Sequence, residues 1–271
     1  RLVIPGRGRR GGAALTHASD LDLVFLFSGD HMRESDGRRP LGGTLYYNRL
    51  AQRVIAALSV PTAAGALYEV DTRLRPSGAQ GPIAVSLDSF ERYQREDAWT
   101  WEHMALCRAR PLFGTAQDRA ELRAIIDAVL LAPRDAAKLR EDVLHMRGEM
   151  AKHKPPKGPL DVKLARGGLV DLEFIVHYLQ LREHAGLDPD LGRGTFESLQ
   201  SARLRLLIVV RLVAPDGMFP PEASRCIVAN ACCPESGGGD WNALLDAVRQ
   251  ARQRIAAAWQ QVFDEELEIE E

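Results

Sequence analysis

The sequence predicts an α+β fold in two domains: residues 1–114 form a mixed sheet with helices, and residues 115–271 form an all-α helical bundle. Strand-like and helix-like patterns mix in the first part, whereas the apolar residues after Gly114 follow helical spacing almost throughout. The helical segments after this point are joined by short connections, as in helix bundles. A chain of 271 residues with 45% hydrophobic residues can bury a core in each domain.

The first acidic segment of the chain is predicted to be a strand. Residues 19–27 are Ser-Asp-Leu-Asp-Leu-Val-Phe-Leu-Phe. In a strand alternate side chains share a face, so Asp20 and Asp22 project together from one side. The opposite face is apolar and is expected to be buried; it consists of Leu21, Leu23, Phe25 and Phe27.

A second acidic strand is predicted at residues 66–74 and ends in a Pro-Ser-Gly turn. Asp71 shares its face of this strand with Arg73 and Arg75. Two interpretations of Asp71 and Arg73 are compatible with each other. They form an ion pair on one strand face, or they serve together in a site for phosphate, which guanidinium groups bind bidentately.

The remaining elements follow from apolar spacing and turn residues. In the first domain we expect an apolar strand at 2–4 that is interrupted by Pro5, a glycine-rich turn at 6–12, an exposed loop at 28–43, a helix at 46–58, a break at 61–62, a helix at 86–94 with Ser86 as its N-cap, and a helix at 99–110 stopped by Pro111. In the second domain we expect helices at 117–131, 134–152, 169–184, 195–213, 221–231 and 242–268.

The paired aspartates indicate a metal site. Two carboxylates side by side repel each other, and aspartate is a poor strand former. A divalent cation would remove the repulsion between Asp20 and Asp22, and Asp71 would supply a third carboxylate. Oxygen ligands of this kind suit Mg²⁺, which also holds the phosphates of nucleotides. Backbone N–H groups at Gly11 and Gly12 could hold those phosphates, although glycine pairs are also common in plain turns.

Composition excludes several classes of function. The chain has 35 Lys and Arg against 37 Asp and Glu, a formal net charge of -2, which disfavours a nucleic-acid partner. No apolar run is long enough to cross a bilayer and no signal peptide is recognised, so we expect no membrane partner and a cytoplasmic setting. The four cysteines lack C-x-x-C spacing and the histidines lack a metal-binding pattern, so no zinc site is expected.

Four motifs together resemble the glutamine synthetase adenylyltransferase family, whose enzymes both add and remove adenylyl groups. They are Gly-Gly, Ser-Asp-Leu-Asp-Leu-Val-Phe, Tyr-Glu-Val-Asp-x-Arg-Leu-Arg-Pro-Ser-Gly, and Ala-Trp-Thr-Trp-Glu-His-x-Ala-Leu-x-Arg-Ala-Arg. The resemblance continues through Asp-Val-Lys at 161–163 and Gly-Gly-Leu-Val-Asp-Leu-Glu-Phe at 167–174. Family members carry two nucleotidyltransferase units, and the residues of these motifs resemble the carboxy-terminal, adenylylating unit more than the amino-terminal, adenylyl-removing unit.

This resemblance implies a nucleotidyltransferase fold of the DNA-polymerase-beta type that uses ATP and Mg²⁺. Glutamine synthetase would be the acceptor through a tyrosine hydroxyl, and a PII signal protein would be a further partner. Asp20, Asp22 and Asp71 would be catalytic metal ligands, with Asp71 also a candidate base towards the tyrosine. The resemblance places five residues at the nucleotide: Gly11, Gly12, Ser19, Arg73 and Arg75. Lys163 is a further candidate, which could reach a phosphate from the second domain.

Other interpretations stay open. The chain departs from the family at Pro5, which predicts a frayed or absent first strand, and at Arg10, where an apolar residue is expected. The alternatives to adenylylation are the phosphorolytic, adenylyl-removing activity and a non-catalytic module that docks on glutamine synthetase or PII. A nucleic-acid nucleotidyltransferase is a distant third.

The helix at 99–110 carries residues with two possible roles. Trp99 and Trp101 could stack on adenine, but we expect core packing for each. Glu102 and His103 could transfer protons, but a solvated or structurally satisfied pair is the expected outcome. Asp171 and Glu173 are expected to stabilise the start of their helix through its dipole.

Overall fold

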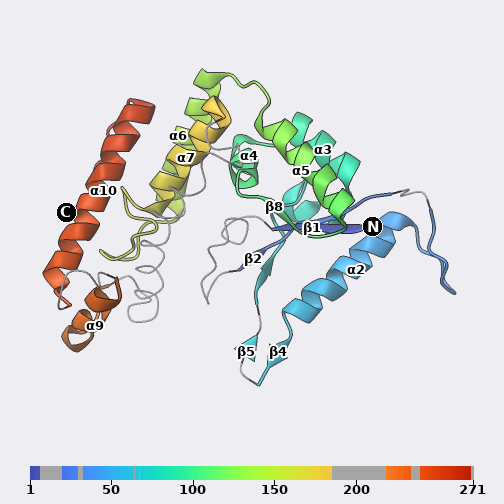
Figure 1. Cartoon of the computed structure of the whole chain (residues 1–271), viewed down its shortest axis with the longest axis horizontal. Coiled ribbons are helices and arrows are strands. Elements are labelled where there is room, and N and C mark those ends of the chain that lie inside the picture. The colour runs from blue at the N-terminus through green and yellow to red at the C-terminus, as the bar shows by residue number, and fades with distance from the viewer. Residues whose placement is uncertain are drawn as a thin grey trace. The chain divides into compact units, whose positions relative to one another are not determined.

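The computed structural model describes residues 1–6, 20–29, 33–63, 65–66, 68–184, 218–232 and 239–269. The chain divides into two compact units, Arg1–Pro133 and Arg134–Glu271, called unit 1 and unit 2 below. Unit 1 contains strands and helices, and the regular elements described in unit 2 are all helices (Figure 1). The fold is therefore mixed α/β with a small mixed sheet, as predicted.

The sheet of unit 1 is built around the first acidic segment. Its strands are β1 (Leu2–Gly6), β2 (Leu21–Asp22), β3 (Phe25–Phe27), β6 (Val70–Asp71), β7 (Ala84–Ser86) and β8 (Arg110–Phe113). Four of them pair in the order β7-β3-β1-β8, and β2 pairs with β6. A bridge between Gly6 and Leu23 joins the end of β1 to the residue after β2, so the acidic segment runs antiparallel to β1 along its length. Its other edge is parallel to β6 and then to β7.

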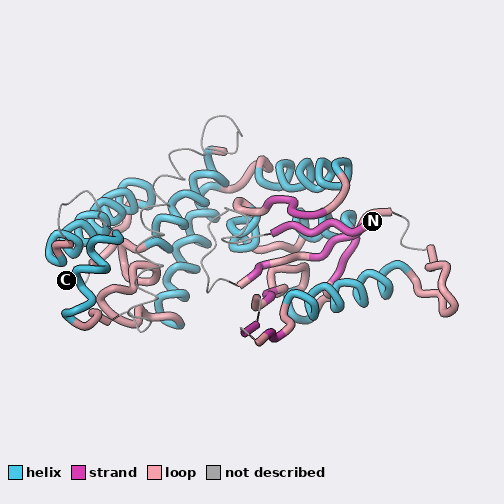
Figure 2. The backbone as a smooth tube through the Cα atoms, turned by 60° about the horizontal axis from the view of Figure 1, so that its bottom comes forward, coloured by secondary structure: helices cyan, strands magenta, loops and turns pink. Residues whose placement is uncertain are grey.

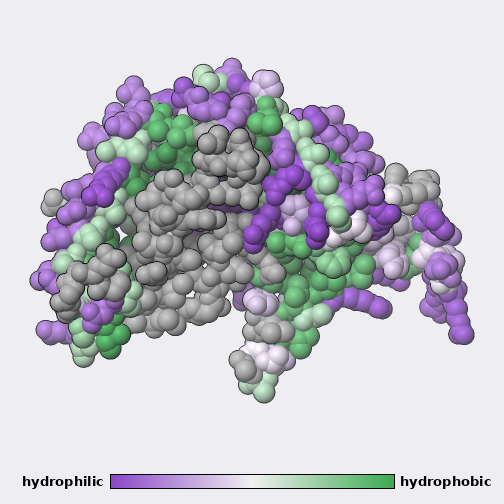
Figure 3. All heavy atoms as spheres, in the orientation of Figure 1, coloured by the Kyte–Doolittle hydropathy of each residue, from purple (hydrophilic) through white to green (hydrophobic). Residues whose placement is uncertain are grey.

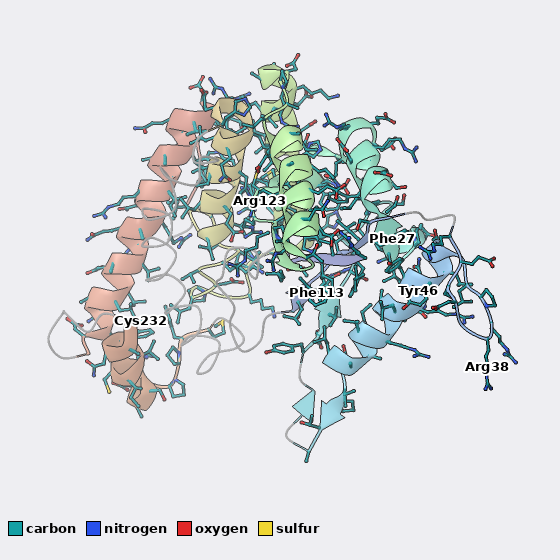
Figure 4. All side chains as sticks on the ribbon, turned by 45° about the vertical axis from the view of Figure 1, so that its right-hand side comes forward. Phe27, Arg38, Tyr46, Phe113, Arg123 and Cys232 are labelled. Atoms are coloured by element: carbon teal, nitrogen blue, oxygen red, sulfur yellow. The ribbon has the colours of Figure 1, made fainter. Side chains whose placement is uncertain are left out.

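Both faces of this acidic segment are covered. Leu21, Leu23, Phe25 and Phe27 form one core cluster with Ala51, Val54 and Ile55 of α2 (Gly43–Leu58), which confirms the predicted buried face. Phe27 stacks on Tyr47 at the start of α2, where Figure 4 labels the neighbouring Tyr46. Val24 and Leu26 of the opposite face are completely buried as well. Helices thus flank the strands of unit 1 on both sides (Figure 2).

Two strand predictions are corrected. The expected strand at 66–74 is much shorter: β5 (Gly65–Ala66) forms a small hairpin with β4 (Pro61–Thr62), and only Val70–Asp71 joins the acidic segment. Pro5 does not abolish the first strand, because the pairing of β1 with β8 shifts register between Ile4 and Pro5. A bulge at this point accommodates a residue that has no N–H to donate.

The helices of unit 1 agree with prediction at most positions. They are α2 (Gly43–Leu58), α3 (Leu87–Glu96), α4 (Thr100–Leu106) and α5 (Ala116–Leu130). The Ser86 side chain accepts the N–H of Ser89, which confirms Ser86 as the N-cap of α3. The helix predicted at 99–110 ends early at Leu106, since Arg110 and Pro111 already belong to β8. The described part of the loop before α2, residues 33–42, is largely exposed, and Arg38 points away from the sheet (Figure 4).

Unit 2 contains α6 (Ala136–His153), α7 (Leu169–Glu183), α9 (Glu222–Cys232) and α10 (Trp241–Phe263). The predicted helix at 195–213 lies outside the described residues. The helix predicted at 242–268 ends at Phe263, because Asp264 takes a left-handed conformation with φ of 50°. The following Leu267 is buried. Among the described helices, none combines the length and apolar character needed to span a membrane.

Candidate active site

The two acidic segments meet at the parallel pair of β2 and β6. Leu21 lies opposite Val70 and Asp22 lies opposite Asp71. Backbone hydrogen bonds from Leu21 N–H to Glu69 and from Leu23 N–H to Asp71, 2.7 and 2.9 Å long, hold this register. Asp20 precedes β2 and is exposed, whereas Asp22 is half-buried. The structure therefore brings Asp22 and Asp71 side by side at the end of the sheet.

The electrostatics of Asp22 are those of a crowded carboxylate. Burial raises the pKa of Asp22 above its ordinary value, and the negative charges of Asp71 and Asp20 raise it further. The positive charges of Arg108 and Arg73 act in the opposite direction and do not fully compensate. A site in which anionic groups outweigh cationic ones at a half-buried position favours a bound cation.

Asp71 has a cationic partner of its own. The Arg73 side chain donates to both carboxylate oxygens of Asp71, with Nε 3.0 Å from Oδ1 and 2.9 Å from Oδ2, and the backbone N–H of Arg73 also donates to Oδ1. These hydrogen bonds lower the pKa of Asp71. The ion pair predicted as one interpretation of this segment is thus confirmed, and Arg73 itself is largely exposed.

Arg75 is used by the loop that follows β6. Its buried guanidinium donates to the carbonyls of Thr72, Ala79 and Gly81 and to the Thr72 hydroxyl, at 2.9–3.2 Å. Every nitrogen of the guanidinium takes part, so Arg75 shapes residues 72–81 and thereby supports the end of β6. Sequence reasoning missed this structural role, which a lone Arg in a strand pattern does not reveal.

The structure does not show where the remaining candidate nucleotide ligands lie relative to Asp22 and Asp71. Gly11, Gly12 and Ser19 lie outside the described residues. Lys163 belongs to unit 2 and is described with that unit alone. Nucleotide binding by these four residues therefore remains a prediction.

The α4 region corrects the expectation for both tryptophans. Trp99 and Trp101 are 72% and 40% exposed, because the buried side of this short helix is formed by Glu102, His103, Met104 and Leu106. Glu102 accepts hydrogen bonds from the Trp99 N–H and the Tyr93 hydroxyl. His103 donates Nε2–H to the Gln94 carbonyl at 2.8 Å. The expectation that Glu102 and His103 are structurally satisfied is confirmed.

The donor set suits a hard divalent cation, although the carboxylates are not assembled as a complete cage. Among the described residues, no three His, Cys, Asp or Glu side chains converge at metal-binding distance. Mg²⁺ usually binds through one or two carboxylates and takes its other ligands from water and substrate phosphates. Asp22 and Asp71 lie opposite each other on parallel strands, and the nearby cations do not fully compensate the negative charge around Asp22. The pair therefore fits that limited role.

The same segments carry the similarity to known proteins. Residues 1–125 match the family described as glutamate-ammonia ligase adenylyltransferase. The match covers 125 of the 271 residues of the chain. The matched stretch contains β1, both acidic strands and the α4 motif, so the family resemblance and the carboxylate pair coincide.

Curated relatives of this adenylyltransferase family extend the match over most of the chain. A protein of Agrobacterium fabrum is 42% identical over 93% of the chain, and one of Rhizobium meliloti is 49% identical over 74%. A protein of Rhodopseudomonas palustris (strain HaA2) is 44% identical over 88%. Each is named bifunctional glutamine synthetase adenylyltransferase/adenylyl-removing enzyme, and the chain spans 28%, 21% and 25% of their respective lengths.

Proposed function

We propose that this chain is an ATP-dependent adenylyltransferase unit that transfers AMP to a tyrosine of glutamine synthetase. The observation that carries the proposal is the pairing of Asp22 with Asp71 at the end of a buried strand, with Asp20 beside them. The family match over residues 1–125 and the printed names of the relatives support the reaction class. Transfer of a nucleotidyl group depends mainly on positioning and on electrostatic stabilisation, which clustered carboxylates with a cation provide.

In the proposed reaction the tyrosine oxygen forms a bond to the α-phosphorus of ATP, and the bond from that phosphorus to the bridging oxygen breaks. Pyrophosphate leaves with the electron pair, and the phenolic proton is lost to a base. A bound Mg²⁺ would polarise the phosphate oxygens and make the phenol more acidic. Because Arg73 lowers the pKa of Asp71, this carboxylate stays ionised and suits cation binding better than removal of a proton from a phenol.

Several finer features belong to the same proposal. The sheet of unit 1 would be a DNA-polymerase-beta-like nucleotidyltransferase domain that ends near residue 114, and the helices after it would form a bundle. ATP and Mg²⁺ would be the cofactors and PII a partner, in a cytoplasmic setting without nucleic acid or membrane. Asp20, Asp22 and Asp71 would be the metal ligands. Gly11, Gly12, Ser19, Arg73 and Lys163 would face the phosphates, while Arg75 would act through its loop.

A direct experiment is to incubate the 271-residue chain with unmodified glutamine synthetase, Mg²⁺ and ATP labelled at the α-phosphate. We expect label on tyrosine, and we expect it to disappear in Asp20→Asn and Asp22→Asn. Asp36→Asn is a matched control, since Asp36 is an exposed carboxylate of the loop before α2. Calorimetric titration with Mg²⁺ and ATP separates catalysis from binding. No measurable binding to the wild-type chain would refute the enzymatic proposal.

The adenylyl-removing direction is the second candidate, because the relatives' names include both activities. In that reaction inorganic phosphate attacks the adenylyl phosphorus and releases the tyrosine. Adenylylated glutamine synthetase supplied with phosphate tests this direction with the same variants. If only this substrate turns over, the direction proposed above is wrong.

A further inference from the structure

A triphosphate carries several negative charges, so its binding site needs cationic groups around it. Arg75 is committed to carbonyls of its own loop, and Arg73 is paired with Asp71 on the β6 side. Asp22 lies between β6 on one edge and β1 on the other. A cation approaching from the β1 side would complete the surroundings of a phosphate held next to Asp22.

We propose that Arg108 is this cation and that its guanidinium binds the polyphosphate of the nucleotide beside Asp22, opposite Arg73. The inference rests on the proposed function and adds one protein residue that binds the nucleotide. Arg108 lies between the end of α4 and the start of β8. It belongs to the Arg-Ala-Arg that ends the fourth sequence motif.

The sheet register places Arg108 near the acidic strand. Arg110 of β8 lies opposite Gly6 of β1, and Gly6 in turn bridges to Leu23, the neighbour of Asp22. The backbones of Leu23 and Arg110 are therefore about 10 Å apart, two strand spacings. Arg108 precedes Arg110 by two residues, at the end of the sheet where Asp22 lies.

The faces of the sheet agree with this placement. Asp22 shares its face with Val24 and Leu26, opposite to the face that α2 covers. Helix α3 contacts β3 and β7 of the same sheet, and α4 packs on α5 next to it. Arg108 leaves the end of α4, so it comes from the layer on the Asp22 side.

The charge of Arg108 acts on Asp22. Its guanidinium lies within electrostatic range of that carboxylate, as that of Arg73 does. The Arg108 side chain is half-buried and its Nε is buried, where charges interact more strongly than in water. A planar guanidinium offers paired N–H donors to phosphate oxygens, which a lysine cannot reproduce. The chemistry that this position recognises is a metal-bound polyphosphate.

Magnesium pyrophosphate, titrated by calorimetry into the full 271-residue chain, tests the inference without catalysis. We expect Arg108→Ala to weaken the binding of magnesium pyrophosphate by 10-fold to 100-fold. Arg108→Lys should recover part of this loss, because lysine keeps the positive charge but lacks the paired N–H donors of a guanidinium. Binding of AMP should change less than twofold. Arg95→Ala is the matched control, since Arg95 pairs with Glu91 on the exposed side of α3.

The outcomes separate the two proposals. If Asp22→Asn abolishes pyrophosphate binding while both Arg108 variants bind as the wild type does, the Arg108 inference is wrong and the proposed function stands. If the wild type binds no magnesium pyrophosphate, or Asp22→Asn binds it unchanged, the proposed site fails first. Should Arg108→Ala not fold, as judged by thermal unfolding, Arg108→Lys decides: unchanged affinity overturns the inference and a loss of threefold or more supports it.

Discussion

Two carboxylates of unit 1 lie in opposite electrostatic surroundings. Asp22 is half-buried among like charges, whereas Asp118 at the start of α5 is buried and accepts hydrogen bonds from neighbouring donors. Asp118 accepts hydrogen bonds from the hydroxyls of Thr115 and Ser28, and its own N–H is capped by Thr115. The first arrangement stabilises a bound cation and the second stabilises the fold.

Asp118 makes the stability of unit 1 dependent on pH. The Thr115 hydroxyl lowers the pKa of Asp118, so the stabilisation is complete above the unfolded value near 4 and is lost as the pH falls through the folded pKa. We expect Asp118→Asn to cost about 1–2 kcal/mol at pH 7, and this cost should vanish at low pH. Urea unfolding of both proteins at a series of pH values measures it. A cost that is equal at pH 7 and at low pH would contradict the assignment.

Asp22 is expected to be a liability for stability when no cation is bound. Like charges placed opposite each other on neighbouring strands destabilise by roughly 0.2–1 kcal/mol. Asp22→Asn should therefore unfold at a higher temperature than wild type in EDTA. Addition of Mg²⁺ at a hundredfold excess over its Kd should stabilise the wild type by about 2.7 kcal/mol and should leave Asp22→Asn nearly unchanged. Equal shifts in both proteins would place the cation elsewhere.

At the level of helices and strands, the glycine pair before α7 shows how a family-like motif serves packing. Gly167 has φ of 70°, and a Cβ there would lie 2.6 Å from the Arg252 carbonyl oxygen of α10. A Cβ on Gly168 would lie 2.5 Å from the Ala165 carbonyl oxygen and 2.8 Å from that of Val162. Only glycine allows this close approach of backbones.

We expect Gly168→Ala to destabilise unit 2 by roughly 1–3 kcal/mol, because backbone must move to admit the methyl group. Gly148→Ala is the control: Gly148 lies inside α6 with nothing within 4 Å of a built Cβ, and alanine is the better helix former by about 1 kcal/mol. Thermal unfolding should therefore shift in opposite directions for the two variants. A shift in the same direction would show that the glycines of unit 2 are not distinguished by contact.

Some apolar side chains of α2 and of the segment after it stay exposed on the surface of unit 1. Apolar atoms are visible over α2 and towards the β4–β5 hairpin on the face shown in Figure 3. Leu45 and Tyr46 of α2, and Val60 after it, are 43–50% exposed. The amphipathic pattern of residues 46–58 predicted the buried side of α2, but this pattern does not identify which exposed apolar side chains a folded surface retains.

In the molecule as a whole, each unit has its own buried polar or charged interaction. In unit 2 Arg147 of α6 is almost completely buried and pairs with the fully buried Asp171 of α7, with Nε 2.5 Å from Oδ1. Asp171 also accepts the Gly167 N–H, and Arg147 donates to the Leu164 carbonyl. The sequence interpretation of Asp171 as a helix-dipole residue missed this pair, because its partner lies 24 positions earlier.

Removal of Arg147 would leave a buried charge without its partner. We expect Arg147→Ala to destabilise unit 2 by about 3–5 kcal/mol, and the double variant Arg147→Met with Asp171→Leu to be less affected. Hydrogen exchange should show lost protection in α6 and α7, while the sheet of unit 1, a separate compact unit, keeps its protection. Equal loss of protection in the sheet would contradict the division into two units.

Local periodicity was sufficient for much of this protein. Alternation along residues 20–27 predicted the face buried against α2, and apolar spacing with Ser86 and similar caps predicted most helices within a few residues. These features depend on neighbours in the chain, so the sequence carries them directly. The pairing of Asp22 with Asp71 and the exposure of Trp99 depend on strand register and on the packing of other segments. Register is set by the whole buried face and not by any one segment, which is why these features became visible only in the folded chain.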